Sequence, residues 1–325
     1  MDVSLVTSLY RSNAFLPRYI DQADRVARAV AAAGLTLELI LVPNDATPTE
    51  RDLIDDFVHQ ADTYTVRVLH VPRESVYASW NRGVEAATAT VIGFWNVDDV
   101  RTADGIHEAH QRITNDGCPI VHLPWVDEYR LRWYGIPDKA YEVHREAVPF
   151  DAARFQRQPF GGPFFMFSPT TYQQVGPFDA RFRVLGDFDW WVRAARMGMR
   201  FCPGTVTGGV FKRHGANLSR GTERGHLEEN IIYLKHGHYD LLYPVNPSAL
   251  RELWLQWADE APPIPDTVYA RWLGSAAEAR WDAAAPRRRL RELLEPPKAL
   301  ARLFINHTGL RRPLYRLGLV KAPLP

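Results

Sequence analysis

Cysteine is scarce in this sequence, since Cys118 and Cys202 are the only two among its 325 residues. Two cysteines this far apart do not argue for a disulfide framework, and they do not form the close pair typical of a zinc site. We therefore expect the protein to work in a reducing compartment, with the cytoplasm as its location.

Long apolar runs and an excess of charge are missing as well. No stretch reaches 18 consecutive apolar residues, and Met1-Asp2 leads directly into the strand-like residues 3–6 without a basic segment. We therefore expect neither a transmembrane helix nor a signal peptide. Lys and Arg number 39 against 38 Asp and Glu, so the net charge is +1 and nothing global predicts a nucleic-acid partner.

The sequence does contain enough apolar residues, 46% of the chain, for a sizeable core. Its first hundred residues alternate between β-branched runs typical of strands and periodic segments typical of helices. The expected strands are 3–9, 37–42, 65–71 and 91–95, and the expected helices are 15–33, 49–60 and 77–87. This alternation predicts an α/β fold, with a mainly parallel, doubly wound sheet and helices on both faces.

The character of the chain changes twice along its length. Residues 1–100 carry the strand-helix repeats, whereas residues 101–240 are less regular and richer in aromatic side chains, and we expect them to shape a pocket in the same domain. Prolines after Leu242 mark a boundary, beyond which residues 241–325 are expected to form a helical, basic extension.

Two adjacent carboxylates, Asp98 and Asp99, follow the apolar run 91–94. Burying them unpaired would be costly, so we expect them at the end of a strand, where open α/β sheets bind ligands. Two oxygen donors there suit a divalent cation that carries a phosphorylated substrate. The alternative is that one of them only caps the helix expected after residue 103.

A second acidic pair, Asp187 and Asp189, stands beside Phe188, Trp190 and Trp191. A helix is expected over 189–197, so Asp187 could cap it and Asp189 could complement its dipole. The functional alternative is a general base whose pKa is raised by its apolar neighbours. The two roles are compatible, because a capping position also fixes the side chain.

A basic segment contains Lys212, Arg213, His214 and Arg220. The cations could neutralise a diphosphate, and His214 could ligate a metal or donate a proton to a leaving phosphate. A single loop histidine in a chain with 11 histidines is more often an ordinary surface residue.

Taken together and in this order, these segments resemble the family 2 glycosyltransferases of the GT-A fold, over about residues 3–219. The resemblance is carried by Val3-Ser4-Leu5-Val6-Thr7-Ser8-Leu9-Tyr10, by the Asn-x-Gly helix 77–84, by Asn96-Val97-Asp98-Asp99, by Gly176-Pro177-Phe178-Asp179 followed by Gly186-Asp187-Phe188-Asp189-Trp190, and by His214 through Asn217 to Ser219. Each segment alone is common, whereas their succession at plausible spacings is specific.

The resemblance implies a role for each matching side chain. It implies donor contacts at Ser8, Tyr10, Asn44 or Asp45, Arg73, Asn81 and Asp98, metal ligation by Asp99 and His214, a catalytic base at Asp187, and diphosphate or acceptor contacts at Lys212, Arg213, Asp189 and Trp190. The chain departs from the family at Asn44, where an acidic residue is usual, so the preferred nucleobase stays open. It also has Asn96 where the metal motif usually begins with Asp.

The expected function is inverting transfer of a sugar from a nucleotide-diphosphate sugar to an acceptor hydroxyl, with Mn²⁺ or Mg²⁺ as cofactor. A UDP-sugar is the expected donor, and a glycan or a lipid-linked glycan is the expected acceptor, in cell-surface polysaccharide synthesis. The resemblance is also compatible with a homodimer. Two alternatives are nucleotidyl transfer, for which no Gly-rich phosphate loop is present, and a catalytically silent nucleotide-sugar binder or scaffold.

The last segment of the chain, residues 287–321, mixes ten basic residues with apolar ones and only two acidic residues. Such a composition could lie on an anionic membrane surface, which would suit a lipid-linked acceptor at the inner face of a membrane. The alternative, which we favour slightly, is a set of helices whose apolar side packs on the catalytic domain.

Overall fold

The computed structural model describes residues 1–133, 136–214, 217 and 223–285. Its strands are β1 (Val3–Leu9), β2 (Leu37–Pro43), β3 (Thr65–Val68), β4 (Val91–Phe94), β5 (Val100–Arg101), β6 (Ile120–His122), β7 (Trp125–Trp133), β8 (Ile136–Arg145), β9 (Phe165–Phe167), β10 (Phe201–Pro203) and β11 (Gly209–Arg213). Its helices are α1 (Leu16–Ala32), α2 (Pro48–Gln60), α3 (Val76–Ala86), α4 (Ala103–Thr114), α5 (Ala152–Phe155), α6 (Pro169–Val175), α7 (Gly186–Arg196), α8 (Glu223–His236), α9 (Pro247–Trp254), α10 (Asp266–Trp272) and α11 (Ser275–Ala283), with a 3₁₀ turn at Tyr239–Leu241.

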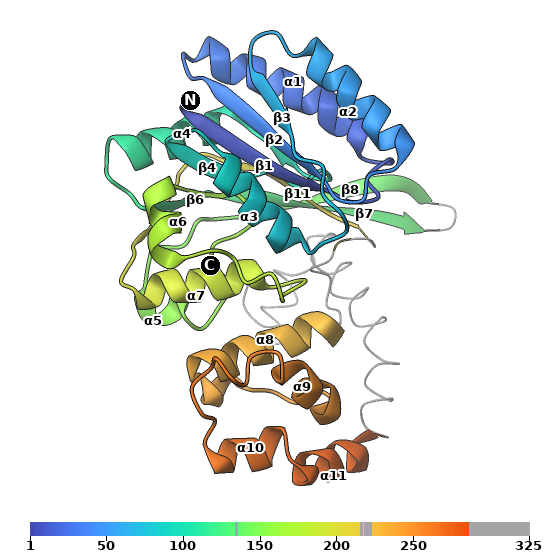
Figure 1. Ribbon diagram of the computed structural model, residues 1–325, viewed down its shortest axis with the longest axis vertical. Helices are drawn as coiled ribbons and strands as arrows, with labels where there is room; N and C mark the ends of the chain where they lie inside the picture. Colours follow the sequence, from blue (N-terminus) through green and yellow to red (C-terminus); the bar gives the residue numbers. More distant parts are fainter. Residues whose placement is uncertain (134–135, 215–216, 218–222, 286–325) are drawn as a thin grey trace, which may run out of the picture. The chain divides into compact units, whose positions relative to one another are not determined.

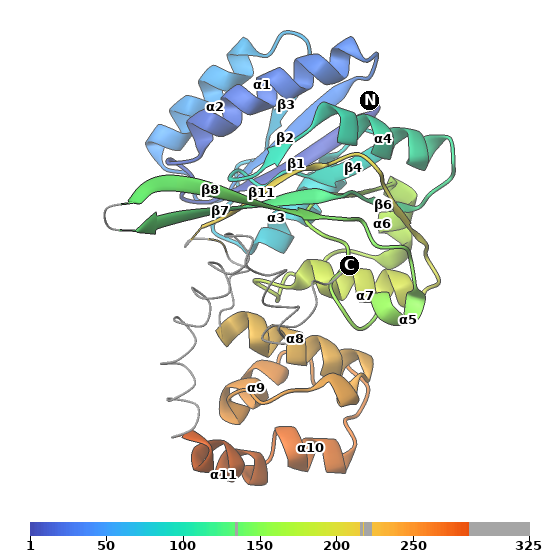
Figure 2. The same cartoon turned by 180° about the vertical axis from the view of Figure 1, so that it is seen from behind.

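The central element is a seven-stranded sheet in the order β10-β6-β9-β4-β1-β2-β3. All neighbours are parallel except β9, which runs antiparallel to both β4 and β6. Helices α1, α2 and α4 cover one face and α3 lies on the other (Figures 1 and 2). The predicted mainly parallel, doubly wound sheet is therefore confirmed.

The core of this sheet is built from strands that are buried on both faces. In β2 and β4 every residue is buried, which explains their nearly continuous apolar sequences. Helix α3 approaches β1 closely through Gly83, where a Cβ atom would lie only 2.2 Å from a methyl carbon of Val6. The glycine of the Asn-x-Gly segment therefore permits the close packing of this helix on the sheet.

A second sheet has the order β5-β11-β7-β8. Strand β11 is parallel to β7 and antiparallel to the short β5, and β7 forms a long hairpin with β8. Because β5 comes just after β4 in the chain, this sheet brings β11 close to the segment that follows β4. The basic residues that end β11 are thereby placed beside the acidic pair.

The two cysteines form a disulfide bond, with their Cα atoms 6.2 Å apart. Strand β10 pairs with β6, so Cys202 lies opposite Val121 and close to Cys118, which precedes β6. From the long distance between the cysteines in the sequence we did not expect a disulfide, and this bond corrects that expectation. That distance carries no information about strands that become neighbours only in the folded sheet.

Breaking this disulfide is expected to lower the free energy of unfolding by about 4 kcal/mol, because the bond closes a long loop in the unfolded chain. The loop spans 84 positions. Denaturant unfolding of the protein with and without reductant measures the difference. In the Cys118→Ala/Cys202→Ala variant the reductant should have no effect, and equal stability of the oxidised and reduced wild type would contradict the prediction.

The chain divides into two compact units, of which the first comprises residues 1–242 and 256–262. The described part of the second unit consists of α9, α10 and α11, and in it Arg251 and Ser248 both bond Glu278 of α11. The predicted membrane-binding segment 287–321 lies outside the described residues. Among the helices that are described, none combines the length and the apolar composition needed to span a membrane.

Candidate functional site

The carboxylate that faces the basic segment is Asp98. Its Oδ2 atom lies 2.8 Å from Nε2 of His214 and accepts a hydrogen bond of 3.1 Å from the side-chain amide of Asn217. The ring of Phe15 stacks on the His214 imidazole, with ring centres 5.1 Å apart. Neither acidic residue caps α4, because Thr102 does so. The helix-capping alternative for this pair is therefore wrong.

The neighbouring carboxylate, Asp99, points into the protein. Only 1% of it is exposed, and its oxygens accept hydrogen bonds of 3.0 Å from the backbone N–H of Lys212 and from the Asn96 amide. Burial, together with the charge of Asp98, raises the pKa of Asp99 well above its usual range. Asp99 thus ties β11 to the loop after β4 and holds His214 beside Asp98.

Asp98 and His214 are the two side chains here that could hold a cation. Their exposed fractions, 18% and 28%, leave donor atoms accessible. Within the described ranges there is no group of three or more His, Cys, Asp or Glu side chains able to hold a metal. Two protein donors nevertheless suit Mg²⁺ or Mn²⁺, since such ions take their remaining ligands from diphosphate oxygens and water.

Four side chains meet beyond the carboxyl ends of β1 and β2. The Tyr10 ring is 39% exposed, and the Arg73 guanidinium lies over it, 4.8 Å from the ring centre. Arg11 and Asp45 have positive φ angles of 51° and 52°, which are uncommon outside glycine, and their charged groups are 3.6 Å apart. Unusual backbone next to an exposed aromatic ring is typical of a ligand site.

The amides of two predicted donor contacts are occupied by the protein itself. The Asn44 side chain is 2% exposed and bonds both the N–H and the carbonyl of Glu74. The Asn81 side chain likewise bonds the N–H and the carbonyl of Phe178. The structure therefore gives both asparagines positioning roles, whereas Ser8 lies half-buried in β1.

Asp187 lies in the first turn of α7, which begins three residues earlier than expected. Leu185 is at the capping position, so Asp187 does not cap the helix. Its Oδ1 atom accepts hydrogen bonds from the backbone N–H of Phe188, at 2.9 Å, and from the hydroxyl of Tyr77, at 3.2 Å. Burial raises the pKa of Asp187 to about 6, and the negative charge of Glu228 adds to the shift.

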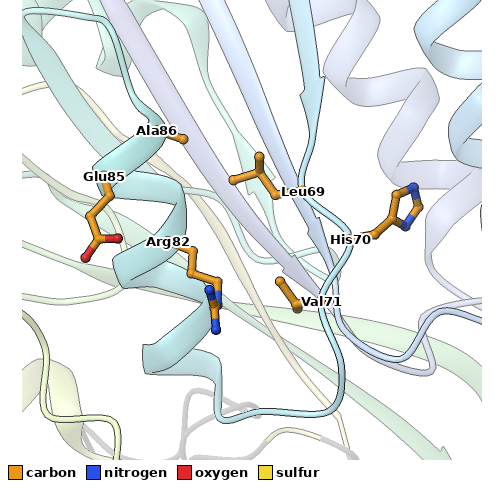
Figure 3. Close-up of a pocket in the computed structure, with 6 residues that line it drawn as sticks. All are labelled: Leu69, His70, Val71, Arg82, Glu85 and Ala86. Atoms are coloured by element: carbon orange, nitrogen blue, oxygen red, sulfur yellow. The ribbon is translucent and has the colours of Figure 1, made fainter.

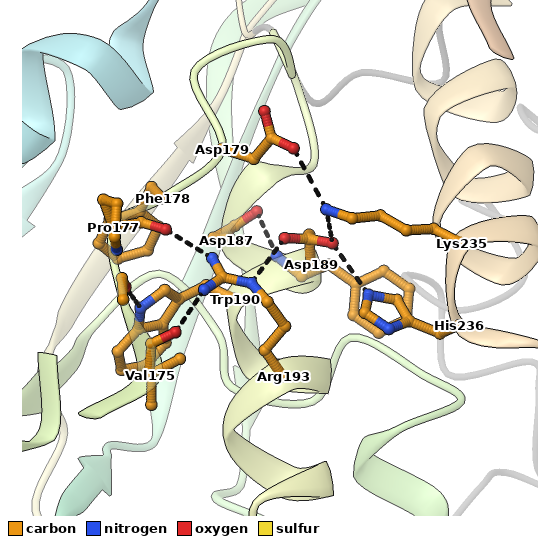
Figure 4. A network of polar contacts seen from close by, with 12 residues as sticks. Val175, Pro177, Phe178, Asp179, Asp187, Asp189, Trp190, Arg193, Lys235 and His236 are labelled. Carbon is orange, nitrogen blue, oxygen red and sulfur yellow. Dashed lines mark hydrogen bonds and ion pairs between the residues drawn. The ribbon is translucent and has the colours of Figure 1, made fainter. Parts of the chain in front are cut away.

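Asp189, by contrast, is completely buried in an ion-pair network (Figure 4). Its oxygens contact Arg193, at 3.0 Å, Lys235, at 2.8 Å, and His236, at 2.9 Å, and these partners hold its pKa below its usual range despite burial. The Trp190 side chain is also fully buried. The structure therefore gives both residues a role in joining α7 to its surroundings, and not the predicted contact with diphosphate or acceptor.

The two basic residues that end β11 are held by acidic residues of β7. The Lys212 ammonium lies 3.6 Å from the Glu128 carboxylate. The Nε atom of Arg213 donates to Asp127, which is fully buried and also accepts from Arg145. These carboxylates fix the direction of both side chains as β11 leads into His214.

The first of the two units also has a shallow depression that does not include the residues described above. Figure 3 shows its lining, which comes from the segment after β3 and from α3: Leu69, His70, Val71, Arg82, Glu85 and Ala86. Neither Asp98 nor Asp187 belongs to this lining. The depression therefore does not mark the candidate site.

The sequence analysis assigned no role to two residues that touch the candidate site. Asn217 is part of the closing segment of the resemblance, three residues after His214, so a role for it could have been expected. Tyr77 gave no such signal, since its contact with Asp187 joins residues 110 positions apart.

The chain is similar to known proteins in sequence and in fold. The family described as "Glycosyl transferase family 2" matches residues 4–174. The crystal structure of S. aureus TarS 1–349 in complex with UDP-GlcNAc is 11% identical, with a TM-score of 0.56, over 86% of this chain and 78% of TarS 1–349. The mannosyltransferase PcManGT from Pyrobaculum calidifontis, in complex with GDP-Man and Mn²⁺, is 13% identical, with a TM-score of 0.52, over 92% of this chain and 80% of its own.

At this level of identity the two structures show a shared fold, which is the predicted GT-A type. Among curated proteins, no sequence matches this chain.

Proposed function

Because the chain belongs to glycosyl transferase family 2, we propose that it is an inverting, metal-dependent glycosyltransferase that uses a nucleotide-diphosphate sugar. The observation that carries this proposal is the arrangement of two groups on one domain. Asp98 and His214 converge beyond the carboxyl end of β4, and α7 presents Asp187 with its raised pKa.

The donor would lie along the carboxyl ends of β1, β2 and β4. The exposed Tyr10 ring, with the Arg73 guanidinium over it, would contact the nucleobase, and the ion pair of Arg11 and Asp45 lies at the same edge of the sheet. Asp98 and His214 would hold Mn²⁺ or Mg²⁺. Such an ion neutralises the negative charge that develops on the leaving diphosphate.

Asp187 would act as the general base. Its ionised carboxylate accepts the proton of the acceptor hydroxyl as the hydroxyl oxygen bonds to the anomeric carbon and the bond from that carbon to the diphosphate breaks. A single displacement of this kind inverts the configuration at the anomeric carbon. It requires no covalent intermediate, so one carboxylate is sufficient.

A UDP-sugar is the donor that we propose, and the acceptor would be a glycan or a lipid-linked glycan in polysaccharide synthesis. The similar structures were crystallised with UDP-GlcNAc and with GDP-Man, so both nucleobases occur on this fold. Incubation with a panel of UDP- and GDP-sugars and Mn²⁺, with release of nucleoside diphosphate as the readout, tests the proposal. Nucleotide binding without release under every condition would favour the silent binder.

The basic C-terminal segment fits the same proposal. If the acceptor is lipid-linked, residues 287–321 would keep the enzyme at the inner, anionic face of a membrane without spanning it. Each side chain of the proposed donor site named above belongs to residues 10–214, outside this segment.

Turnover is expected to fall on the acidic side of a midpoint at about pH 6, because Asp187 must be ionised to accept a proton and its pKa is raised to about 6. Below the midpoint the rate should drop about tenfold per pH unit. The measurement is the turnover number at saturating donor and acceptor from about pH 5 to pH 8, with circular dichroism as a check of folding. A rate that stays constant to about pH 5 would exclude Asp187 as the base.

A further inference from the structure

The side chain of Tyr77, on helix α3, contacts the residues around Asp187. This tyrosine is only 3% exposed, and its hydroxyl oxygen lies 2.8 Å from the carbonyl oxygen of Val184 and 3.2 Å from Oδ1 of Asp187. Its ring lies against Gly186, where a Cβ atom would come within 2.7 Å of it. A larger residue at the start of α7 would therefore displace the tyrosine from the carboxylate.

Helix α8 also holds the residues just before Asp187. The buried carboxylate of Glu228 accepts hydrogen bonds from the N–H groups of Arg183, Val184 and Leu185. Arg224 pairs with Glu228 on its own helix. The residues just before Asp187 are thus fixed between two helices, and little freedom is left for the carboxylate to move.

The groups around Asp187 shift its pKa in opposite directions. Glu228 raises the pKa of Asp187 by charge repulsion, whereas the hydrogen bonds from Tyr77 and Phe188 lower it. Asp189, on the same helix, is paired with Arg193, Lys235 and His236. The single proton of the Tyr77 hydroxyl is shared between the carbonyl oxygen of Val184, at 2.8 Å, and Oδ1 of Asp187, at 3.2 Å. The part of this bond that reaches Asp187 favours the ionised form of the carboxylate.

We propose that Tyr77 is a positioning residue for the catalytic base. Its hydroxyl orients the half-buried Asp187 carboxylate and favours the ionised form of this group. This inference rests on the proposed function for its effect on the rate. Its effect on the carboxylate itself does not depend on that function.

The test is Tyr77→Phe, which removes the hydroxyl and keeps the ring. The pKa of Asp187 is read directly from the ¹³C carboxyl signal of aspartate-labelled protein, and this signal is assigned by its loss in Asp187→Asn. Loss of a hydrogen bond to a charged group should raise this pKa by about one unit. The acid limb of the turnover profile should shift equally, so that activity at about pH 5 falls tenfold and activity at about pH 8 barely changes.

A matched control is Tyr172→Phe. The Tyr172 hydroxyl also makes a partly buried hydrogen bond, of 2.9 Å to Asn81, but no contact with Asp187. This variant should leave both the carboxyl titration and the acid limb where they are in the wild type.

The two readouts separate the failure of this inference from that of the proposed function. An unchanged Asp187 titration in Tyr77→Phe, or the same shift in Tyr172→Phe, would overturn the role of Tyr77. A shifted titration with no matching shift of the acid limb would confirm that Tyr77 controls the carboxylate, and it would show that Asp187 is not the base.

Discussion

Replacing Asp187 with Asn is expected to lower the turnover number about a hundredfold or more while leaving donor affinity unchanged. The amide cannot accept the proton of the acceptor hydroxyl, but its oxygen can still accept the hydrogen bonds from Phe188 and Tyr77 that Asp187 receives. The position of the side chain should therefore be preserved. Steady-state kinetics and titration of nucleotide binding, on the same protein preparation, measure the two quantities.

The same substitution should also change how stability depends on pH. The folded-state pKa of Asp187, about 6, lies above its ordinary value of 3.8, so the folded state binds more protons than the unfolded state between these values. This contribution to wild-type stability is complete below the lower value and is lost as the pH rises through the upper one. Asp187→Asn lacks this loss, and we expect it to be at least as stable as the wild type at neutral pH.

Asp104→Asn is a suitable control for the measurements of turnover and of nucleotide binding. Asp104 is exposed and also lies in the first turn of a helix, α4. Its substitution should change neither turnover nor donor binding. If Asp187→Asn instead weakens donor binding and leaves the turnover number unchanged at saturation, then Asp187 belongs to the donor site and the proposed mechanism is wrong.

The part of the site that the sequence predicts best is the end of β4. An apolar run that stops at two carboxylates can hardly lie anywhere but at the end of a buried strand, since burial of unpaired charges is costly. The sequence could not tell which carboxylate faces the donor. Successive side chains point in different directions, and the direction of each is decided by β11, which begins 110 positions after Asp99.

The surroundings of Asp187 and Asp189 illustrate the same limit. Both stand in the same aromatic segment, yet one carboxylate has a raised pKa and the other a lowered one. The difference comes from Lys235 and His236 on α8, which reach Asp189 from 46 and 47 positions away in the sequence. Local patterns predict helices and strands, whereas contacts of this range appear only once the helices are packed.

Asp98→Asn is expected to weaken metal-dependent binding of the nucleoside diphosphate about a hundredfold, because it removes the charged oxygen donor beside His214. Asp99→Asn is expected to bind almost as the wild type does. Its amide oxygen can still accept from the Lys212 N–H, and the Asn96 amide can turn to present its oxygen. Calorimetric titration with UDP and with GDP, each with and without Mn²⁺, measures both variants.

The comparison of these two variants decides between the metal ligand that the family resemblance implies and the one that the geometry favours. If Asp99 is the metal ligand, as the resemblance implies, then Asp99→Asn should lose the Mn²⁺ dependence and Asp98→Asn should keep it. The opposite result would show that Asp98 and His214 hold the ion and that Asp99 acts through the backbone of β11. Because Asp99 is 1% exposed whereas Asp98 is open to the site, we expect the second outcome.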